Sequence, residues 1–138
     1  NSTLFALAGF AAWTLLLTFI LLNLRGYYAF VSKNKVPLNQ FSPDGSDIKG
    51  FGQRLTRAHL NCIEMLPSFC AIVIVASLSN QTDMMESTVM YVFYARVFQS
   101  VVHLISTSVV AVLLRASLWS AQLALLLFYS YKLFEVYL

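Results

Sequence analysis

The stretch LFALAGFAAWTLLLTFILLNL, residues 4–24, is almost wholly apolar and is followed directly by Arg25. A helix rises about 1.5 Å per residue, so about 20 residues cross a hydrocarbon core of about 30 Å. The run is too long for the core of a signal peptide, and no small-residue cleavage motif closes it. It therefore predicts a first membrane-spanning helix over residues 4–24.

The whole chain has the composition of a membrane protein. Of its 138 residues, 59% are hydrophobic and 11% are charged, against roughly 25% charged residues in typical soluble domains. A soluble domain of this size could not cover so much apolar surface. The net charge of +3 is small, and the basic residues do not form a nucleic-acid-binding stripe. We therefore expect contact with membrane lipid and none with nucleic acid.

The two cysteines, Cys62 and Cys70, both lie in an apolar run. Their spacing fits neither a zinc site nor a CxxC redox pair. We expect them to be reduced packing residues, and we expect no metal site.

Three further helices are expected after a polar loop over residues 25–52, which contains the turn sequence SPDG at residues 42–45. Their approximate ranges are 53–79, 87–106 and 114–137. A short loop over residues 80–86 joins the second helix to the third. The chain is thus predicted to be a single all-α membrane domain over residues 1–138, built as a bundle of four transmembrane helices.

The distribution of Lys and Arg predicts the orientation in the membrane. The basic residues in or beside the first loop are Arg25, Lys33, Lys35, Lys49, Arg54 and Arg57, and Arg115 lies beside the third loop. Four crossings place these two loops on one side, whereas the second loop has no Lys or Arg. The positive-inside rule therefore makes the first and third loops cytoplasmic. The sequence does not distinguish a bacterial inner membrane from the endoplasmic reticulum.

Two of the expected helices each carry one polar stripe. The stripe of the second helix is Arg54, Arg57, Asn61 and Glu64, and that of the third is Arg96, Gln99, His103 and Ser106. Offsets of 0, 3, 7 and 10 place each set on one helical face. Because charge within a membrane is costly, both stripes should face protein or a water-filled pocket.

The two stripes are expected to meet at Glu64 and Arg96. Each lies about 11 residues from the cytoplasmic end of its helix, hence roughly 16 Å deep, where an unpaired charge costs on the order of several kcal/mol. We expect a buried ion pair between them, at the floor of a polar funnel. Polar contacts that only join helices are the simpler interpretation. Three arginines with Asn, Gln and His exceed that need and favour an anionic ligand.

The segment RLTRAHLNCIEMLP, residues 54–67, resembles the signature of the MAPEG family, the membrane-associated proteins in eicosanoid and glutathione metabolism. The family pattern RxxRAHxNxxE followed by Pro is matched at every position, with spacing most like the leukotriene synthase branch. Residues 95–97, Ala-Arg-Val, resemble an element of the family's third helix. The resemblance covers essentially the whole chain. It implies a homotrimer that binds glutathione between neighbouring subunits near the cytoplasmic side.

By this resemblance, the positions that bind glutathione or order its site are Arg57, Asn61, Glu64 and Arg96. Arg115 matches the fourth-helix arginine that stabilises the thiolate, and an ordinary positive-inside anchor is its alternative role. His103 replaces a tyrosine that commonly contacts glutathione, and an imidazole can also form hydrogen bonds there. The segment from His103 to Arg115 is a few residues longer than in the familiar enzymes. Trp119, one turn beyond Arg115, is a further candidate lining residue, and His59 is expected at a subunit interface or behind the site.

The resemblance implies a glutathione-dependent membrane transferase or peroxidase. It would present the glutathione thiolate to a lipophilic electrophile or peroxide that arrives from the bilayer. A non-catalytic family member, which binds lipid or serves as an accessory subunit of a larger membrane complex, is the alternative interpretation. A small transporter is not supported, because the sequence has neither repeats nor helices broken by Gly or Pro.

Overall fold

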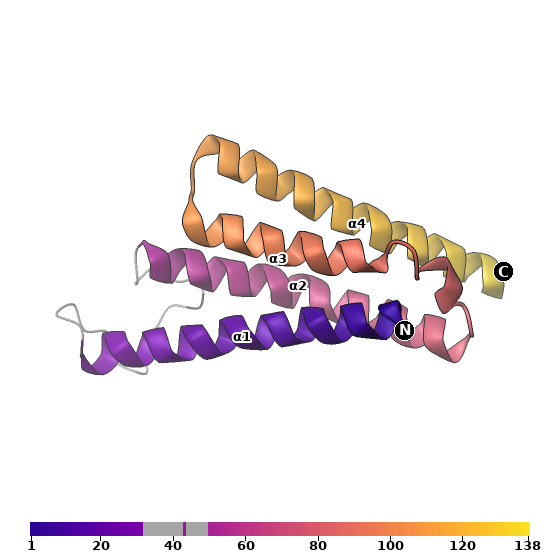
Figure 1. The fold of residues 1–138 in the computed structure, drawn as a ribbon, viewed down its shortest axis with the longest axis horizontal. Helices are drawn as coiled ribbons and strands as arrows, with labels where there is room; N and C mark the ends of the chain where they lie inside the picture. The colour runs from indigo at the N-terminus through magenta and orange to yellow at the C-terminus, as the bar shows by residue number, and fades with distance from the viewer. Residues whose placement is uncertain (32–42, 44–49) are drawn as a thin grey trace.

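The computed structural model describes residues 1–31, 43 and 50–138. The elements of this part of the chain are α1 (Ser2–Phe30), α2 (Phe51–Leu78), the short 3-10 helix η1 (Thr82–Met84), α3 (Val89–Ile105) and α4 (Val109–Tyr137) (Figure 1). No strand occurs among these described residues, so the prediction of an all-α four-helix bundle is confirmed. Lys33, Lys35, Lys49 and most of the predicted SPDG turn lie outside the described residues.

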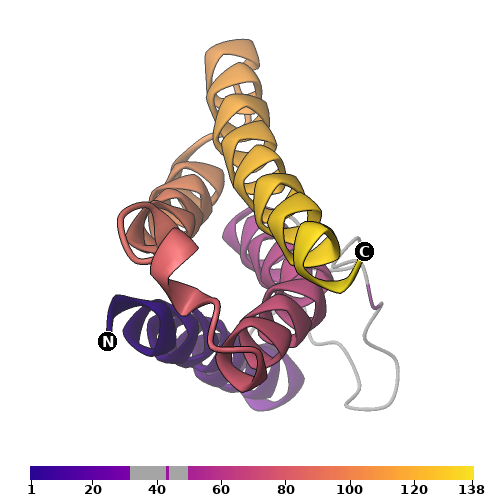
Figure 2. The same cartoon turned by 90° about the vertical axis from the view of Figure 1, so that its right-hand side faces the viewer.

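The four long helices run alternately in opposite directions. Both chain termini and the α2–α3 connection lie at one end of the bundle, which we call the terminal end (Figure 1). The α1–α2 and α3–α4 connections lie at the opposite end, the loop end. Helices α1, α2 and α3 contact one another, whereas α4 packs mainly on α3 and leans away from α1 in the end-on view (Figure 2). The α2–α4 seam is therefore the looser one.

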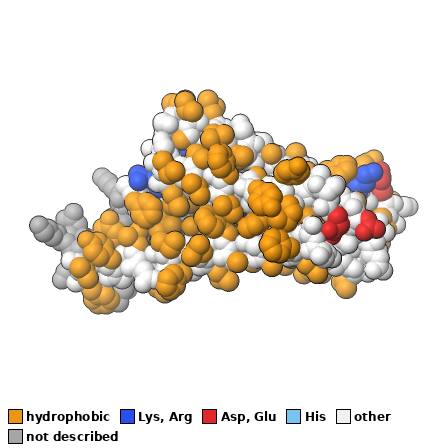
Figure 3. Space-filling view, viewed as in Figure 1, with side chains coloured by type: hydrophobic (Ala, Val, Ile, Leu, Met, Phe, Trp, Pro, Cys, Tyr) orange, Lys and Arg blue, Asp and Glu red, His pale blue; other side chains and the backbone are white. Residues whose placement is uncertain are grey.

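The described helices have the lengths and surfaces of membrane spans. Helices α1, α2 and α4, with 28 or 29 residues each, are long and apolar enough to cross a membrane. Helix α3 has 17 residues, about 25 Å of helix, and it joins connections at opposite ends of the bundle, so it crosses as well (Figure 1). Hydrophobic side chains dominate the middle of the face seen in Figure 3, and charged ones lie toward its ends. Lipid is the solvent for that middle band.

Two helices extend further than the sequence predicts. Helix α1 continues well past residue 24, through Arg25, to Phe30. Helix α4 begins at Val109 instead of near Leu114, because the Ser108 hydroxyl oxygen accepts a hydrogen bond from the Ala111 backbone N–H (3.2 Å) and caps the helix. Arg115 consequently lies in the second turn of α4 and not at its start.

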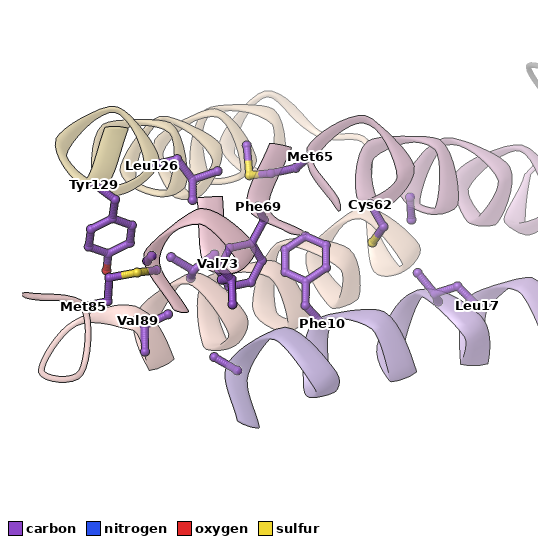
Figure 4. Packing of buried hydrophobic residues seen from close by; sticks show 14 of the residues in the cluster. Phe10, Leu17, Cys62, Met65, Phe69, Val73, Met85, Val89, Leu126 and Tyr129 are labelled. Atoms are coloured by element: carbon purple, nitrogen blue, oxygen red, sulfur yellow. The ribbon is translucent and has the colours of Figure 1, made fainter. Parts of the chain in front are cut away.

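An apolar core fills the space between α1, α2 and α3. Phe10 of α1 and Phe69 of α2 are fully buried, and their rings meet edge to face with centroids 5.4 Å apart (Figure 4). Such a ring pair is worth about 0.5–1.5 kcal/mol beyond its burial. Gly9 lets α1 approach α3 closely, because a Cβ atom there would lie 2.9 Å from Cζ of Phe93. Close packing therefore fixes α1 against both neighbours.

Glu86, in the α2–α3 connection, holds the first turn of α1. Its carboxylate accepts hydrogen bonds from the backbone N–H groups of Ser2 and Thr3 (2.9 and 3.3 Å) and from the Thr3 hydroxyl (2.7 Å). A helix N-terminus has unpaired N–H groups and the positive end of the helix dipole, so a carboxylate is stabilised there. The Thr3 hydroxyl bond is the main cause that lowers the pKa of Glu86, and the backbone bonds add to it.

We expect Glu86→Gln to lower the thermal unfolding midpoint of the detergent-solubilised protein by a few degrees at neutral pH. Because the folded-state pKa of Glu86 is lowered, its stabilisation is present above the ordinary value of 4.5 and is lost as the pH falls through the folded value. The difference between wild type and variant should therefore shrink in acid. Asp83→Asn changes an exposed carboxylate in the same connection and is the control. Equal shifts of the unfolding midpoint in the two variants would show that Glu86 does not stabilise the first turn of α1.

Candidate functional site

The polar stripes of α2 and α3 meet through Asn61 and Arg54 of α2, whereas Arg57 and Glu64 of the same stripe are exposed. Asn61 Nδ2 of α2 lies 3.4 Å from His103 Nδ1 of α3, and Arg54 Nε of α2 donates to the Leu104 carbonyl oxygen (2.9 Å). The amide nitrogen of Asn61 can only donate, so this contact requires the imidazole tautomer with its proton on Nε2. His103 is buried, and its contact with Asn61 fixes the position of the Asn61 side chain.

The expected ion pair between Glu64 and Arg96 is wrong for the single chain. Arg96 is fully buried, its Nε donates to Gln122 Oε1 (3.0 Å), and its Nη2 contacts Met65 Sδ (3.6 Å). Glu64 is exposed and forms no ion pair among the described residues. The estimated depth agrees with the structure, because Arg96 meets Met65, the next residue after Glu64. The rotation of α2 about its axis differs from the expected one. Neighbouring residues of a helix point about 100° apart, so Glu64 points away when Met65 faces Arg96.

An open groove of about 490 Å³ lies between α2, α3 and α4. Its lining residues are Asn61 and Glu64 of α2, Gln99 of α3, and Val112, Arg115, Ala116, Trp119 and Ser120 of α4. The volume lies within the range of roughly 300–1,000 Å³ found for small-molecule sites. A carboxylate, two amides, a guanidinium and an indole thus border one space. Trp119 lines the groove together with Arg115, as predicted from its position one turn further along the helix.

The predicted site residues lie in different surroundings. Asn61, Glu64 and Arg115 line the groove, Arg96 and His103 are buried outside its lining, and Arg57 is exposed and also outside it. Arg115 is half-buried, and its buried Nε has no hydrogen-bond partner among the described residues. The groove therefore borders a cation with unused donor capacity. His59 lies off the stripe, with its Nε2 2.7 Å from the Thr18 hydroxyl oxygen of α1.

Two glutamines connect Arg96 to the groove. Gln122 Oε1 accepts from Arg96, and Gln122 Nε2 donates to Gln99 Oε1 (2.8 Å). Gln99 belongs to the predicted α3 stripe, but Gln122 lies in the apolar run of α4, so the sequence alone does not single it out. Gln122 shares one face of α4 with Arg115 and Trp119, because the three residues have offsets of 0, 4 and 7.

The groove continues along the α2–α4 seam into an apolar hollow of about 290 Å³. Glu64 and Trp119 line both spaces. The other lining residues of the hollow are Met65, Ser68, Ile72, Leu123, Leu126, Leu127 and Ser130. A second hollow of about 240 Å³ shares Ile72 and Ser130 with the first and extends to Tyr137. A polar site and an apolar path thus meet at Glu64 and Trp119.

Four membrane-crossing helices, three of which border a polar groove, define an integral membrane protein. The chain belongs to the MAPEG family, whose profile matches residues 3–134. The resemblance carried by residues 54–67 is therefore confirmed over nearly the whole chain. Comparisons with curated proteins and with solved structures gave no match.

If the groove is open to water, a cysteine in its lining should react with charged thiol reagents. We expect Ala116→Cys, in a background without Cys62 and Cys70, to be labelled by a charged methanethiosulfonate in lipid nanodiscs about tenfold faster than Ala111→Cys. Ala116 lines the groove, whereas Ala111 lies on the same helix and is buried, and thiolate formation needs access to water. Equally slow labelling of both positions would contradict an open groove.

Proposed function

We propose that this protein is a membrane-bound, glutathione-dependent transferase or peroxidase. The observation that carries the proposal is the convergence of Asn61, Glu64 and Arg115 on one groove that opens into an apolar hollow. Membership of the MAPEG family, which includes glutathione transferases and related enzymes, supports the same function. The groove would hold glutathione, and the hollow would hold a lipophilic second substrate that enters from the membrane.

The groups that border the groove complement those of glutathione. Glutathione has two carboxylates, one ammonium, two peptide groups and a thiol. The Arg115 guanidinium suits a carboxylate or a thiolate, and the amides of Asn61 and Gln99 suit carboxylate or peptide oxygens. Glu64 has no ion-pair partner among the described residues, so the ligand ammonium would supply the missing cation.

Arg115 is the proposed catalytic residue. A guanidinium beside a thiol stabilises the thiolate, so a larger fraction of bound glutathione is nucleophilic at neutral pH. Arg115 lines the groove, so its guanidinium would meet a ligand anion there. In a transfer reaction, the thiol proton passes to solvent and the thiolate sulfur forms a bond to the electrophilic carbon of the second substrate. The leaving group on that carbon departs with the electron pair of the bond that breaks.

The other predicted site residues would act around the ligand. His103 holds Asn61 in place, and Arg96 is connected to the groove through Gln122 and Gln99. Arg57 is exposed in the single chain. In the homotrimer that the family resemblance implies, this cation and the open side of the groove would lie at a subunit boundary. Arg57 would then contact glutathione bound between two copies.

The loop end of the bundle is the proposed cytoplasmic side, in a bacterial inner membrane or the endoplasmic reticulum. Arg25, Arg54, Arg57 and Arg115 all lie in the parts of their helices nearest that end. The positive-inside rule retains such residues on the cytoplasmic side. Glutathione would therefore reach the groove from the cytoplasm.

A non-catalytic member that binds lipid or joins a larger membrane complex is the second candidate. One observation favours it. Where family enzymes commonly have a tyrosine, His103 is buried against Asn61 and is not part of the groove lining. A ligand in the groove would then lack the hydroxyl contact that the tyrosine makes.

Titration with glutathione in nanodiscs, followed by thiolate absorbance, tests these alternatives. We expect saturable binding at millimolar glutathione together with a thiolate signal. Arg115→Ala should lower the thiolate fraction about tenfold, which corresponds to about one pK unit, and Arg115→Lys should lower it less. Lys132→Ala removes a partly exposed cation, paired with Glu135 near the terminal end, and should change neither quantity.

The two functions differ in these readouts. Absence of binding by the wild-type protein would overturn the glutathione-dependent function. Binding without a thiolate signal would favour the non-catalytic member.

A further inference from the structure

Arg96 is a buried cation whose described hydrogen-bond partners and ring contact are all neutral. Its guanidinium bonds to Gln122 Oε1 and Met65 Sδ and lies 5.4 Å from the ring centroid of Phe10. Its buried Nη1 has no partner among the described residues. A buried charge is expensive, and apolar side chains join helices at least as well. The position of Arg96 therefore needs an explanation other than helix packing.

Arg96 fixes the direction of hydrogen bonding through Gln122. A guanidinium has five N–H donors and no acceptor, so the Gln122 atom 3.0 Å from Arg96 Nε is the amide oxygen. The Gln122 amide nitrogen then points the other way and donates to Gln99 Oε1 (2.8 Å) and to the Leu118 carbonyl oxygen (3.2 Å). Gln99 uses its amide oxygen to accept this hydrogen bond, so the N–H groups of its amide remain available as donors. A neutral amide at position 96 would allow either direction.

We propose that Arg96 and Gln122 are positioning residues that present Gln99 to the groove as a hydrogen-bond donor. Gln99 is only 3% exposed, yet it lines the groove beside Asn61 and Glu64. A donor at this place recognises an acceptor oxygen of the ligand, either a carboxylate or an amide carbonyl. Glutathione has both, and this choice of ligand rests on the proposed function. An inverted Gln99 amide would face such oxygens with its own oxygen, so no hydrogen bond would form.

The variant Gln122→Glu tests the direction of the relay. Its carboxylate still accepts from Arg96 but cannot donate to Gln99, so the Gln99 amide turns and its oxygen faces the groove. Gln122→Met removes both hydrogen bonds at similar volume. Each variant should raise the Kd for glutathione in nanodiscs about tenfold, as expected for one lost charge-assisted hydrogen bond.

Coupling separates positioning from a general loss of structure. Gln99→Met should also raise the Kd about tenfold, and Gln99→Met combined with Gln122→Met should bind no more weakly than either single variant. Gln81→Met replaces a glutamine of the α2–α3 connection, outside the groove lining, and should keep the wild-type Kd. Fully additive losses at Gln99 and Gln122 would overturn the proposal.

Hydrogen exchange of the side-chain amides tests the orientation without any ligand. In protein with isotope-labelled glutamine, the resonances are assigned by substitution. The Gln122 amide protons should exchange slowly with deuterium, and those of Gln99 about tenfold faster. In Gln122→Glu, the Gln99 amide donates to the new carboxylate, so its exchange should slow.

The exchange result stands apart from the proposed function. If the wild-type protein binds no glutathione, the glutathione-dependent function fails, and exchange still decides the orientation of Gln99. The proposal is overturned if the Gln99 amide is as protected as that of Gln122 in the wild-type protein. It is also overturned if Gln99 exchange is unchanged in Gln122→Glu.

Discussion

The absence of water from a bilayer core is the constraint on which this structure depends. Backbone N–H and C=O groups there must bond within the protein, which restricts the spans to helices, and charged side chains must find polar partners inside the bundle. The chain meets the second requirement in part by bringing the stripes of α2 and α3 together, with Asn61 against His103 and Arg54 on a backbone carbonyl, whereas Arg57 and Glu64 of α2 are exposed in the single chain. The groove lies where α4 completes the enclosure less tightly.

Length and hydropathy predict the fold correctly because each is a property of one segment at a time. Helical spacing also groups each polar stripe on one helical face, and the cost of charge within a membrane predicts that these faces turn toward protein or a water-filled pocket. The pairing of Glu64 with Arg96 fails for a physical reason: spacing gives angles within one helix but not how that helix is rotated against its neighbours. Here α2 turns Met65 toward Arg96. The early start of α4 depends on one capping bond at Ser108, which hydropathy does not reveal.

The site shows the same division. The sequence places Arg57, Arg96 and Arg115 in one site, but their surroundings differ: the first is exposed, the second fully buried and the third half-buried at the groove. Three-dimensional neighbours decide which of them can touch a ligand. Gln122, a single amide in an apolar run, acquires a role only because Arg96 lies opposite. The sequence could single out residues that belong to a polar stripe. It could not single out Gln122, because its partners Arg96 and Gln99 lie on another helix.

The placement of Arg96 also affects how the chain is assembled in the membrane. An arginine at the centre of a transmembrane helix disfavours insertion by about 2.5–3.5 kcal/mol, and α3, with 17 residues, has little apolar length to offset it. Gln122 of α4 supplies the hydrogen bond that Arg96 lacks on its own helix. Only a few residues separate α3 from α4, so both partners are available at once when the pair inserts as a hairpin. Insertion as a hairpin would therefore lower the cost of placing Arg96 in the membrane.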